Sequence, residues 1–368
     1  MSVHGTVWTL ARQKKLTPEV FMLPVSSSDK IIAQHHEAYR QIVTLGGASI
    51  SDNPAAPFLV AEREVWKDVA SRKTMPSYLC DKAKAKYYFA EVGMPVLETY
   101  LFNDLKLFRK FADTPCILKP ANSGGSSSGN DACYTLFANA RDLIEAHNNP
   151  TLWGTFIKEQ SLVIQRAVVG PDMPYGQLHI EAVVNGKGEA YFSSSHEIEF
   201  VNGRWTHQLD AQDKDQPQIA EIKERVRELV KLHGIKNCML SLQHLRDFGE
   251  GTWYPTDWQY RLSYNTVWGR RVFEPEYVGS LVRYMTDQVS AVEGTSTRSY
   301  FQQTVKVKRM DKEAMRSSMR NHNIVYIPTG RRASDTELNF LFLSSGATYS
   351  EAKEAMDTFA LEVGDVRE

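Results

Sequence analysis

Residues 116–129 read Cys-Ile-Leu-Lys-Pro-Ala-Asn-Ser-Gly-Gly-Ser-Ser-Ser-Gly. The apolar residues 116–118 predict a short strand that ends at Lys119, and the glycines and serines after it predict a loop. Glycines let a backbone approach a bulky anion, while serine hydroxyls and consecutive N–H groups donate to phosphate oxygens. Because Lys119 precedes the glycines, the pattern differs from the Walker motif. We predict a loop that folds over nucleotide phosphates, with a flexible surface linker as the alternative.

The composition is that of an enzyme-sized globular protein. A chain of 368 residues exceeds a single hydrophobic core, so two or three subdomains are expected. The formal net charge of −1 argues against nucleic-acid binding as the main function. The cysteines have neither metal nor disulfide spacing, and they are Cys80, Cys116, Cys133 and Cys238. Reduced thiols, no visible signal peptide and no long apolar run predict a cytoplasmic protein without a membrane segment.

Helix and strand signals are mixed along the chain and predict an α/β (α+β) protein. Asp81 is a good N-cap for a helix at 82–92 that Gly93 ends. Alternation at 178–184, the turn Asn185-Gly186 and a return at 189–193 predict a hairpin. Further strands are predicted at 20–25, 96–101, 132–136, 239–246, 252–260, 301–307 and 339–343. Further helices are predicted at 29–45, 62–71, 105–112, 140–147 and 219–233, and after Thr348.

Several landmarks in this order resemble the ATP-grasp superfamily, most closely the branch with biotin carboxylase, carbamoyl-phosphate synthetase and phosphoribosylamine–glycine ligase. The resemblance covers roughly residues 75–270, and the C-terminal segment is similar as well. Lys82, directly after Asp81, matches a helix lysine that contacts phosphate in that family. Lys119 with the loop after it is similar to the family's flap strand and its phosphate-binding lysine.

The resemblance implies ATP as the nucleotide. The segment at 163–168 resembles the hinge whose backbone meets adenine, and the segment at 178–181 resembles the strand beside the ribose. The implied ATP contacts are Lys82, Lys119, Gly124, Gly125, Ser126, Ser127, Ser128, Gln165, Ala167, Val168, His179 and Glu181. Several of these residues have an alternative role that involves no ligand. Lys82 lies near Lys84 and Lys86 and so fits a solvated helix face, Gln165 fits a polar edge position, and His179 alternates with apolar neighbours.

The predicted metal strands match the family in spacing but not in chemistry. The family places a Glu on one strand and Glu-x-Asn-x-Arg on the next, where this chain has Gln243 and the run Asp257-Trp258-Gln259-Tyr260-Arg261. Mg²⁺ prefers anionic oxygen, and Asp257 is the one carboxylate among the expected ligands Gln243, Asp257 and Gln259. A single Mg²⁺ bound mostly by phosphate is therefore expected.

The expected catalytic residues are two arginines. Arg261 keeps its family place, where it would clamp the transferring phosphoryl group. Arg270 lies in the segment 263–271, the best candidate for recognition of the acceptor, because a guanidinium binds carboxylate or phosphate bidentately. A pair of surface arginines at Arg270 and Arg271 is the alternative.

The resemblance implies an ATP-grasp fold in four segments. These are a supporting domain at 1–75, a mobile flap at 76–165, a central antiparallel sheet with the metal and acceptor site at 166–275, and a C-terminal hairpin and helix at 276–368. The implied activity is an ATP-dependent ligase that turns a small-molecule or peptide carboxylate into an acyl phosphate and joins it to an amine. A biotin/bicarbonate-type carboxylase and a non-catalytic nucleotide-binding module are the alternatives. A homodimer is compatible with the sequence.

Overall fold

The computed structural model describes residues 19–22, 48–49, 58–61, 74–101, 111, 114–121, 135–137, 162–168, 175–201, 204–210, 217–246, 251–260, 273–293, 298–307, 312–327 and 339–363. The helices predicted at 29–45, 62–71 and 140–147 lie outside these residues, as does most of the one at 105–112. The helices, strands and contacts named below are those of these residues.

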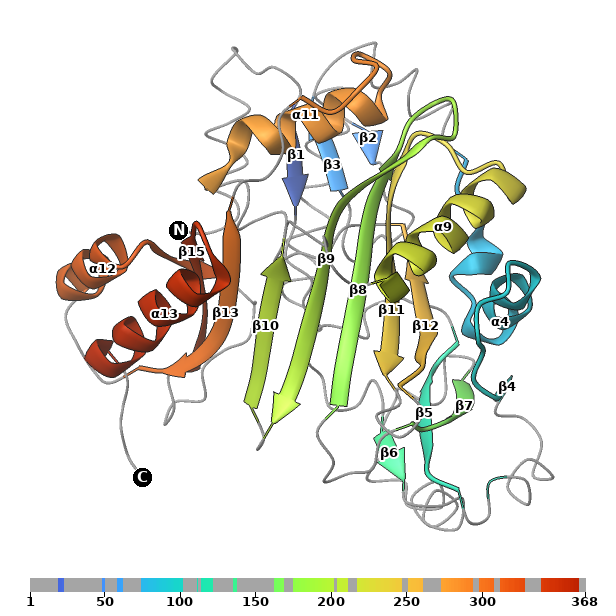
Figure 1. The fold of residues 1–368 in the computed structure, drawn as a ribbon, viewed down its shortest axis with the longest axis horizontal. Helices are drawn as coiled ribbons and strands as arrows, with labels where there is room; N and C mark the ends of the chain where they lie inside the picture. Colours follow the sequence, from blue (N-terminus) through green and yellow to red (C-terminus); the bar gives the residue numbers. More distant parts are fainter. Residues whose placement is uncertain are drawn as a thin grey trace.

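An antiparallel sheet of eight strands forms the body of the protein (Figure 1). Its strands lie in the order β12-β11-β8-β9-β10-β13-β15-β14, and every neighbouring pair is antiparallel. Their bounds are β8 Tyr175–Val184, β9 Ala190–Val201, β10 Arg204–Asp210, β11 Cys238–Arg246, β12 Trp253–Gln259, β13 Ser299–Lys306, β14 Ile324–Ile327 and β15 Asn339–Gly346. The antiparallel character that the sequence predicts for the central sheet is therefore confirmed, while β13, β14 and β15 extend the sheet beyond the predicted bounds of 166–275.

Two smaller sheets complete the strand content. A four-stranded sheet has the order β4-β7-β5-β6, and its bounds are β4 Thr99–Leu101, β5 Cys116–Pro120, β6 Thr135–Phe137 and β7 Leu162–Arg166. A three-stranded sheet has the order β1-β3-β2, with bounds β1 Glu19–Met22, β2 Ala48–Ser49 and β3 Phe58–Ala61. The strand that the apolar run before Lys119 predicts is thus β5, which pairs with both β6 and β7.

The β8–β9 hairpin turns at Asn185 and Gly186, as predicted. The Asn185 Oδ1 atom accepts from the backbone N–H groups of Lys187, at 3.0 Å, and Glu189, at 2.9 Å. The Gly186 N–H donates to Asp287 Oδ1 at 2.9 Å, so the turn is also held from outside the hairpin. Strand β9 extends to Val201, well beyond the predicted 189–193, because it pairs with β10 as well as β8.

The helices are η1 Ser77–Leu79, α4 Lys82–Glu91, α9 Pro217–Leu232, α11 Pro275–Met285, α12 Lys312–Asn321 and α13 Tyr349–Val363. Helices η1, α11 and α12 and strands β2, β3, β10 and β14 have no counterpart in the sequence-based prediction. Helix α12 is amphipathic, since Met315 and Met319 pack against the cluster beneath α13 while Glu313 and Arg316 are exposed. Among the described helices, none has the length and apolar character that crossing a membrane requires.

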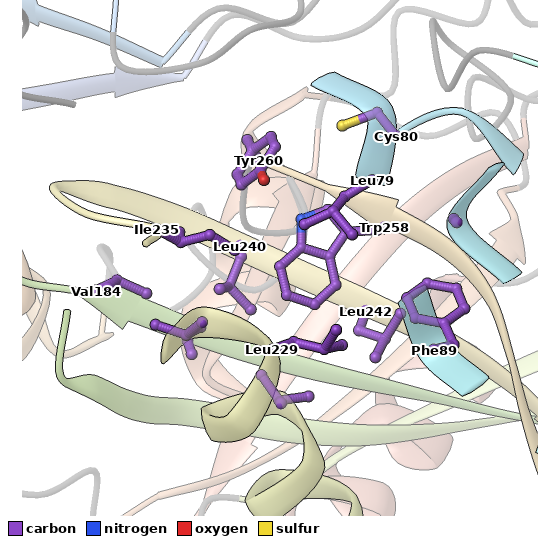
Figure 2. Close-up of a cluster of buried hydrophobic side chains, with 14 of the residues drawn as sticks. Leu79, Cys80, Phe89, Val184, Leu229, Ile235, Leu240, Leu242, Trp258 and Tyr260 are labelled. Carbon is purple, nitrogen blue, oxygen red and sulfur yellow. The ribbon is translucent and has the colours of Figure 1, made fainter. Parts of the chain in front are cut away.

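The largest core cluster packs α4 and α9 against strands β8, β11 and β12 (Figure 2). Leu229 of α9, Phe89 of α4, Leu242 of β11 and Trp258 of β12 are each at most 3% exposed. Burial of such side chains is the main favourable contribution to folding. This packing sets the position of α4 beside β12, which is an edge strand of the large sheet.

We predict that Phe89→Ala lowers the free energy of unfolding by about 3 kcal/mol, because it leaves a cavity between α4 and the sheet. Denaturant unfolding followed by circular dichroism measures the change. The matched control is Tyr87→Ala on the same helix, where the side chain is 62% exposed and the loss should be well below 1 kcal/mol. Equal losses in the two variants would contradict the described packing of α4.

Candidate functional site

The predicted metal and ribose residues meet on one face of the large sheet. Strand register places His179 of β8 opposite Gln243 of β11, and Gln243 opposite Asp257 of β12. Two residues away along the same strands, Ser241 of β11 lies opposite Glu181 of β8 on one side and Gln259 of β12 on the other. Successive side chains of a strand point to opposite faces, so both rows lie on the face away from the α9 core. Three strands that are far apart in sequence therefore contribute to one polar surface.

The opposite face carries apolar side chains from the same strands. Leu242 and Trp258 are fully or almost fully buried in the core cluster. His244 lies one residue beyond Gln243, past an irregularity in the pairing with β12, and is 1% exposed. Burial lowers the pKa of His244 to about 3, so the ring is neutral at physiological pH. His244 is a core residue, and it does not supply charge to the polar face.

Helix α4 brings Lys82 to this surface. Asp81 caps the helix, since its side chain accepts from the Ala83 N–H at 2.9 Å, and Gly93 at φ 75° follows the last turn. The Lys82 N–H donates to the Ala121 carbonyl oxygen at 2.8 Å. Ala121 lies two residues after Lys119, where the Gly/Ser segment begins. The structure thus joins the two segments that carry the predicted phosphate-binding lysines.

A buried ion pair connects α4 to β12. The Lys82 Nζ atom lies 3.2 Å from Asp257 Oδ1, and both side chains are 3% exposed. The other carboxylate oxygen, Oδ2, accepts from Gln259 Nε2 at 2.6 Å. Within the described residues, Lys82 Nζ and Asp257 Oδ1 have no hydrogen bond of good geometry besides this charge contact. The predicted phosphate lysine and the predicted metal carboxylate are therefore direct partners.

The donors of the predicted metal site do not fit a divalent cation held by the protein itself. Asp257 supplies one negative charge, and the Lys82 ammonium already neutralises it. Gln243 and Gln259 offer neutral amides, and Gln259 uses its amide nitrogen toward Asp257. No group of three His, Cys, Asp or Glu side chains in the described part of the chain is arranged to hold a metal ion. A hard cation needs more anionic oxygen than these side chains supply.

The three clustered lysines of α4 have different environments. Lys84 is exposed, with 63% of its side chain accessible, and pairs with Asp81 at 3.5 Å. Lys86 donates to the Thr99 carbonyl oxygen and lies 4.6 Å from the centroid of the Tyr100 ring. The alternative of a solvated helix face therefore applies to Lys84, while Lys82 and Lys86 are engaged. Sequence reasoning did not single out Lys86, which fastens α4 to strand β4.

The predicted adenine hinge is strand β7 and the two residues after it. Gln165 is buried, and its Nε2 atom donates to Thr99 Oγ1 at 2.7 Å. The Ala167 N–H donates to the Pro115 carbonyl oxygen at 2.8 Å. These bonds tie the hinge to β4 and to the start of β5. Contact of Gln165, Ala167 and Val168 with adenine stays a prediction.

Several expected site residues lie outside what the structure describes. Lys119 has its backbone in β5, and its side chain is not among the described ones. Not described at all are Gly124, Gly125, Ser126, Ser127, Ser128, Arg261 and Arg270. Their assignments stay predictions.

Comparisons with known proteins agree on the fold. A carboxyaminoimidazole ribonucleotide synthase from Aspergillus clavatus, solved with ATP, gives a TM-score of 0.56 at 11% identity over 78% of this chain and 74% of its own. An L-amino acid ligase from Bacillus licheniformis gives 0.56 at 14% identity over 82% and 76%, respectively. A biotin carboxylase from Campylobacter jejuni gives 0.54 at 12% identity over 79% and 68%. No family model and no curated protein matches the sequence.

These similar structures are all ATP-grasp proteins, and the chain has the ATP-grasp fold. The ATP-grasp fold that the sequence predicts is thereby confirmed. At 11–14% identity the likeness concerns the fold, so the activity is argued below from the residues themselves.

We predict that the Lys82–Asp257 pair shows strong coupling in a double-mutant cycle. Lys82→Met and Asp257→Asn should each cost about 3 kcal/mol of unfolding free energy, because each leaves a buried charge without its partner. The double variant, which removes both charges, should be less destabilised than the sum by about 3 kcal/mol. Urea unfolding of the four proteins measures the cycle. Additive costs would mean that the two charges do not interact in solution.

Proposed function

We propose that the protein is an ATP-dependent ligase that activates a carboxylate as an acyl phosphate and joins it to an amine. The observation that carries the proposal is the placement of Lys82, which contacts Asp257 of β12 through its side chain and Ala121 of the Lys119 segment through its backbone. The backbone that follows Lys119 therefore lies against the first turn of α4, although Lys119 and Lys82 are 37 positions apart, 119 minus 82. We propose that the two lysines act together on the phosphates of a nucleotide, because ammonium groups make charge-assisted hydrogen bonds to phosphate oxygens.

The chemistry requires positioning and charge neutralisation rather than a dedicated nucleophile. The γ-phosphoryl group passes to a carboxylate oxygen, ADP leaves, and the amine attacks the acyl carbon with release of phosphate. In this proposal Lys82 and Lys119 neutralise the ATP phosphates, Arg261 clamps the transferring group and Arg270 binds the acceptor. Residues 124–128 fold over the phosphates and exclude water, which would otherwise hydrolyse the acyl phosphate.

The cofactor Mg²⁺ is assigned here to the phosphates of ATP. The side chains expected to hold it, Gln243, Asp257 and Gln259, do not form a metal site by themselves, because Lys82 neutralises Asp257. We place the activity in the cytoplasm, and a homodimer is compatible with it.

The second candidate is a nucleotide-binding module without turnover. Two observations favour it. Gln243 and Gln259 carry neutral amides at positions where the ATP-grasp family has acidic or metal-coordinating residues. In addition, Asp257 is already paired with Lys82. Binding of ATP is common to both candidates, whereas ADP formation is specific to the ligase.

We predict that ADP and ATP raise the melting temperature by mass action and that Lys119→Ala weakens ADP binding by about 1.5–3 kcal/mol. The reason is the loss of charge-assisted phosphate contacts. Calorimetric titration measures the affinity. The matched control is Lys84→Ala, because Lys84 is exposed on α4, and it should bind ADP as wild type does. A Lys119→Ala variant with unchanged affinity would place the phosphates elsewhere.

We predict that ADP release requires both a carboxylate and an amine. The assay offers pools of carboxylates and amines with ATP and Mg²⁺, each pool alone and both together. Turnover with bicarbonate alone would indicate the carboxylase. Nucleotide binding without ADP release in any pool would support the non-catalytic module. Arg261→Ala should reduce turnover by about 100-fold or more while nucleotide affinity changes little, since its proposed contact forms in the transition state.

A further inference from the structure

The Lys82–Asp257 pair bears on how the candidate nucleotide site balances charge. A nucleotide brings several negative charges toward a surface that already contains the Asp257 carboxylate. A protein-held divalent cation is one solution, in which carboxylates and phosphates share the ion. The described residues point to another solution, because a lysine ammonium already lies 3.2 Å from that carboxylate.

The Asp257 carboxylate has both oxygens engaged. Oδ1 faces the Lys82 ammonium, and Oδ2 accepts from the Gln259 amide at 2.6 Å. A cation that bound Asp257 would have to displace Lys82 or lie beside its positive charge in a region where both side chains are 3% exposed. Low exposure strengthens that repulsion, because little water screens it. Gln243, directly across from Asp257 on β11, adds no negative charge to attract a metal.

Lys82 also keeps the capacity to bind a second anion. An ammonium has three N–H donors, and within the described residues Lys82 Nζ makes no hydrogen bond of good geometry. Its backbone N–H is bonded to Ala121, at the entrance to the Gly/Ser segment. A phosphate group that reached Lys82 Nζ would therefore meet an ammonium that Asp257 already holds in place.

We infer that Lys82, held by Asp257, occupies the position of a protein-bound divalent cation, so that this chain binds ADP with an affinity nearly independent of Mg²⁺. The inference rests on the proposed function, since it concerns the same nucleotide site. The inference adds that the positive charge at this site comes from a side chain of the protein, the Lys82 ammonium. Mg²⁺ that accompanies ATP is then held by the phosphates.

The test is calorimetric titration of the full chain with ADP in MgCl₂ and in EDTA. The two dissociation constants should agree within about fivefold, which corresponds to about 1 kcal/mol, whereas a protein-held metal would tighten ADP binding by more than that. ADP binding that depends on Mg²⁺ by more than fivefold overturns the inference and leaves the proposed function standing. Absence of ADP binding in both media overturns the proposed function and this inference together.

Gln243→Glu supplies the second experiment, because it places a second carboxylate directly across from Asp257. This variant should gain Mg²⁺ dependence of about tenfold or more, mainly through weaker ADP binding in EDTA, since the added charge repels phosphate. Gln243→Met is the uncharged control of similar size, and whatever its ADP affinity, its dissociation constants in MgCl₂ and in EDTA should agree within about fivefold, as in wild type. If Gln243→Glu shows no more Mg²⁺ dependence than Gln243→Met, this row of the sheet does not face the phosphates and the inference fails.

Lys82 is tested directly by Lys82→Met. Loss of its ammonium should weaken ADP binding by about tenfold or more in both media, as expected for a charge-assisted phosphate contact. Lys84→Met on the same helix is the control, because Lys84 is exposed. A circular dichroism spectrum and melting curve confirm that each variant is folded. A folded Lys82→Met protein that binds ADP as wild type does overturns the inference.

Discussion

The buried contact between Lys82 and Asp257 is the constraint on which the candidate site depends. Two charges at 3% exposure are costly to remove from water, and each is tolerated because the other is 3.2 Å away. The pair joins the first turn of α4 to the edge strand of the large sheet. It also determines the chemistry that is available, since it cancels the one carboxylate of the predicted metal set. Such an ammonium can still donate hydrogen bonds to a phosphate ligand.

The pair can form because the apolar core holds α4 against the sheet. Phe89 of α4 and Leu229 of α9 pack on the same cluster as Trp258, so the helix that carries Lys82 is placed by hydrophobic burial. Trp258 and Asp257 are adjacent in sequence and point to opposite faces of β12. One face of the strand therefore builds the core while the other presents the polar site. Neighbouring residues thus couple the stability of the fold to the geometry of the site.

Much of the fold was predictable because its signals are local. Asp81 as a cap, Gly93 after the helix and the Asn185 turn act within a few residues, and each has the predicted role. Elements whose signals depend on a distant partner were missed. Strand β10 is stabilised by pairing with β9 and β13, so its own sequence carries a weak pattern. Helix α12 was missed although Met315 and Met319 have helical spacing, because the two methionines are few among its polar residues.

The sequence by itself determined which residue types are available to the site: lysines at 82 and 119, one carboxylate and two amides at the expected metal positions. It also identified the ATP-grasp resemblance, because motif order along the chain is a linear property. Only the tertiary structure decided that Lys82 neutralises Asp257 and that Gln165 is bonded to Thr99. Those contacts join segments 175 and 66 positions apart, 257 minus 82 and 165 minus 99. Strand register and helix packing determine which of these distant residues come into contact, and no local stretch of sequence encodes either one.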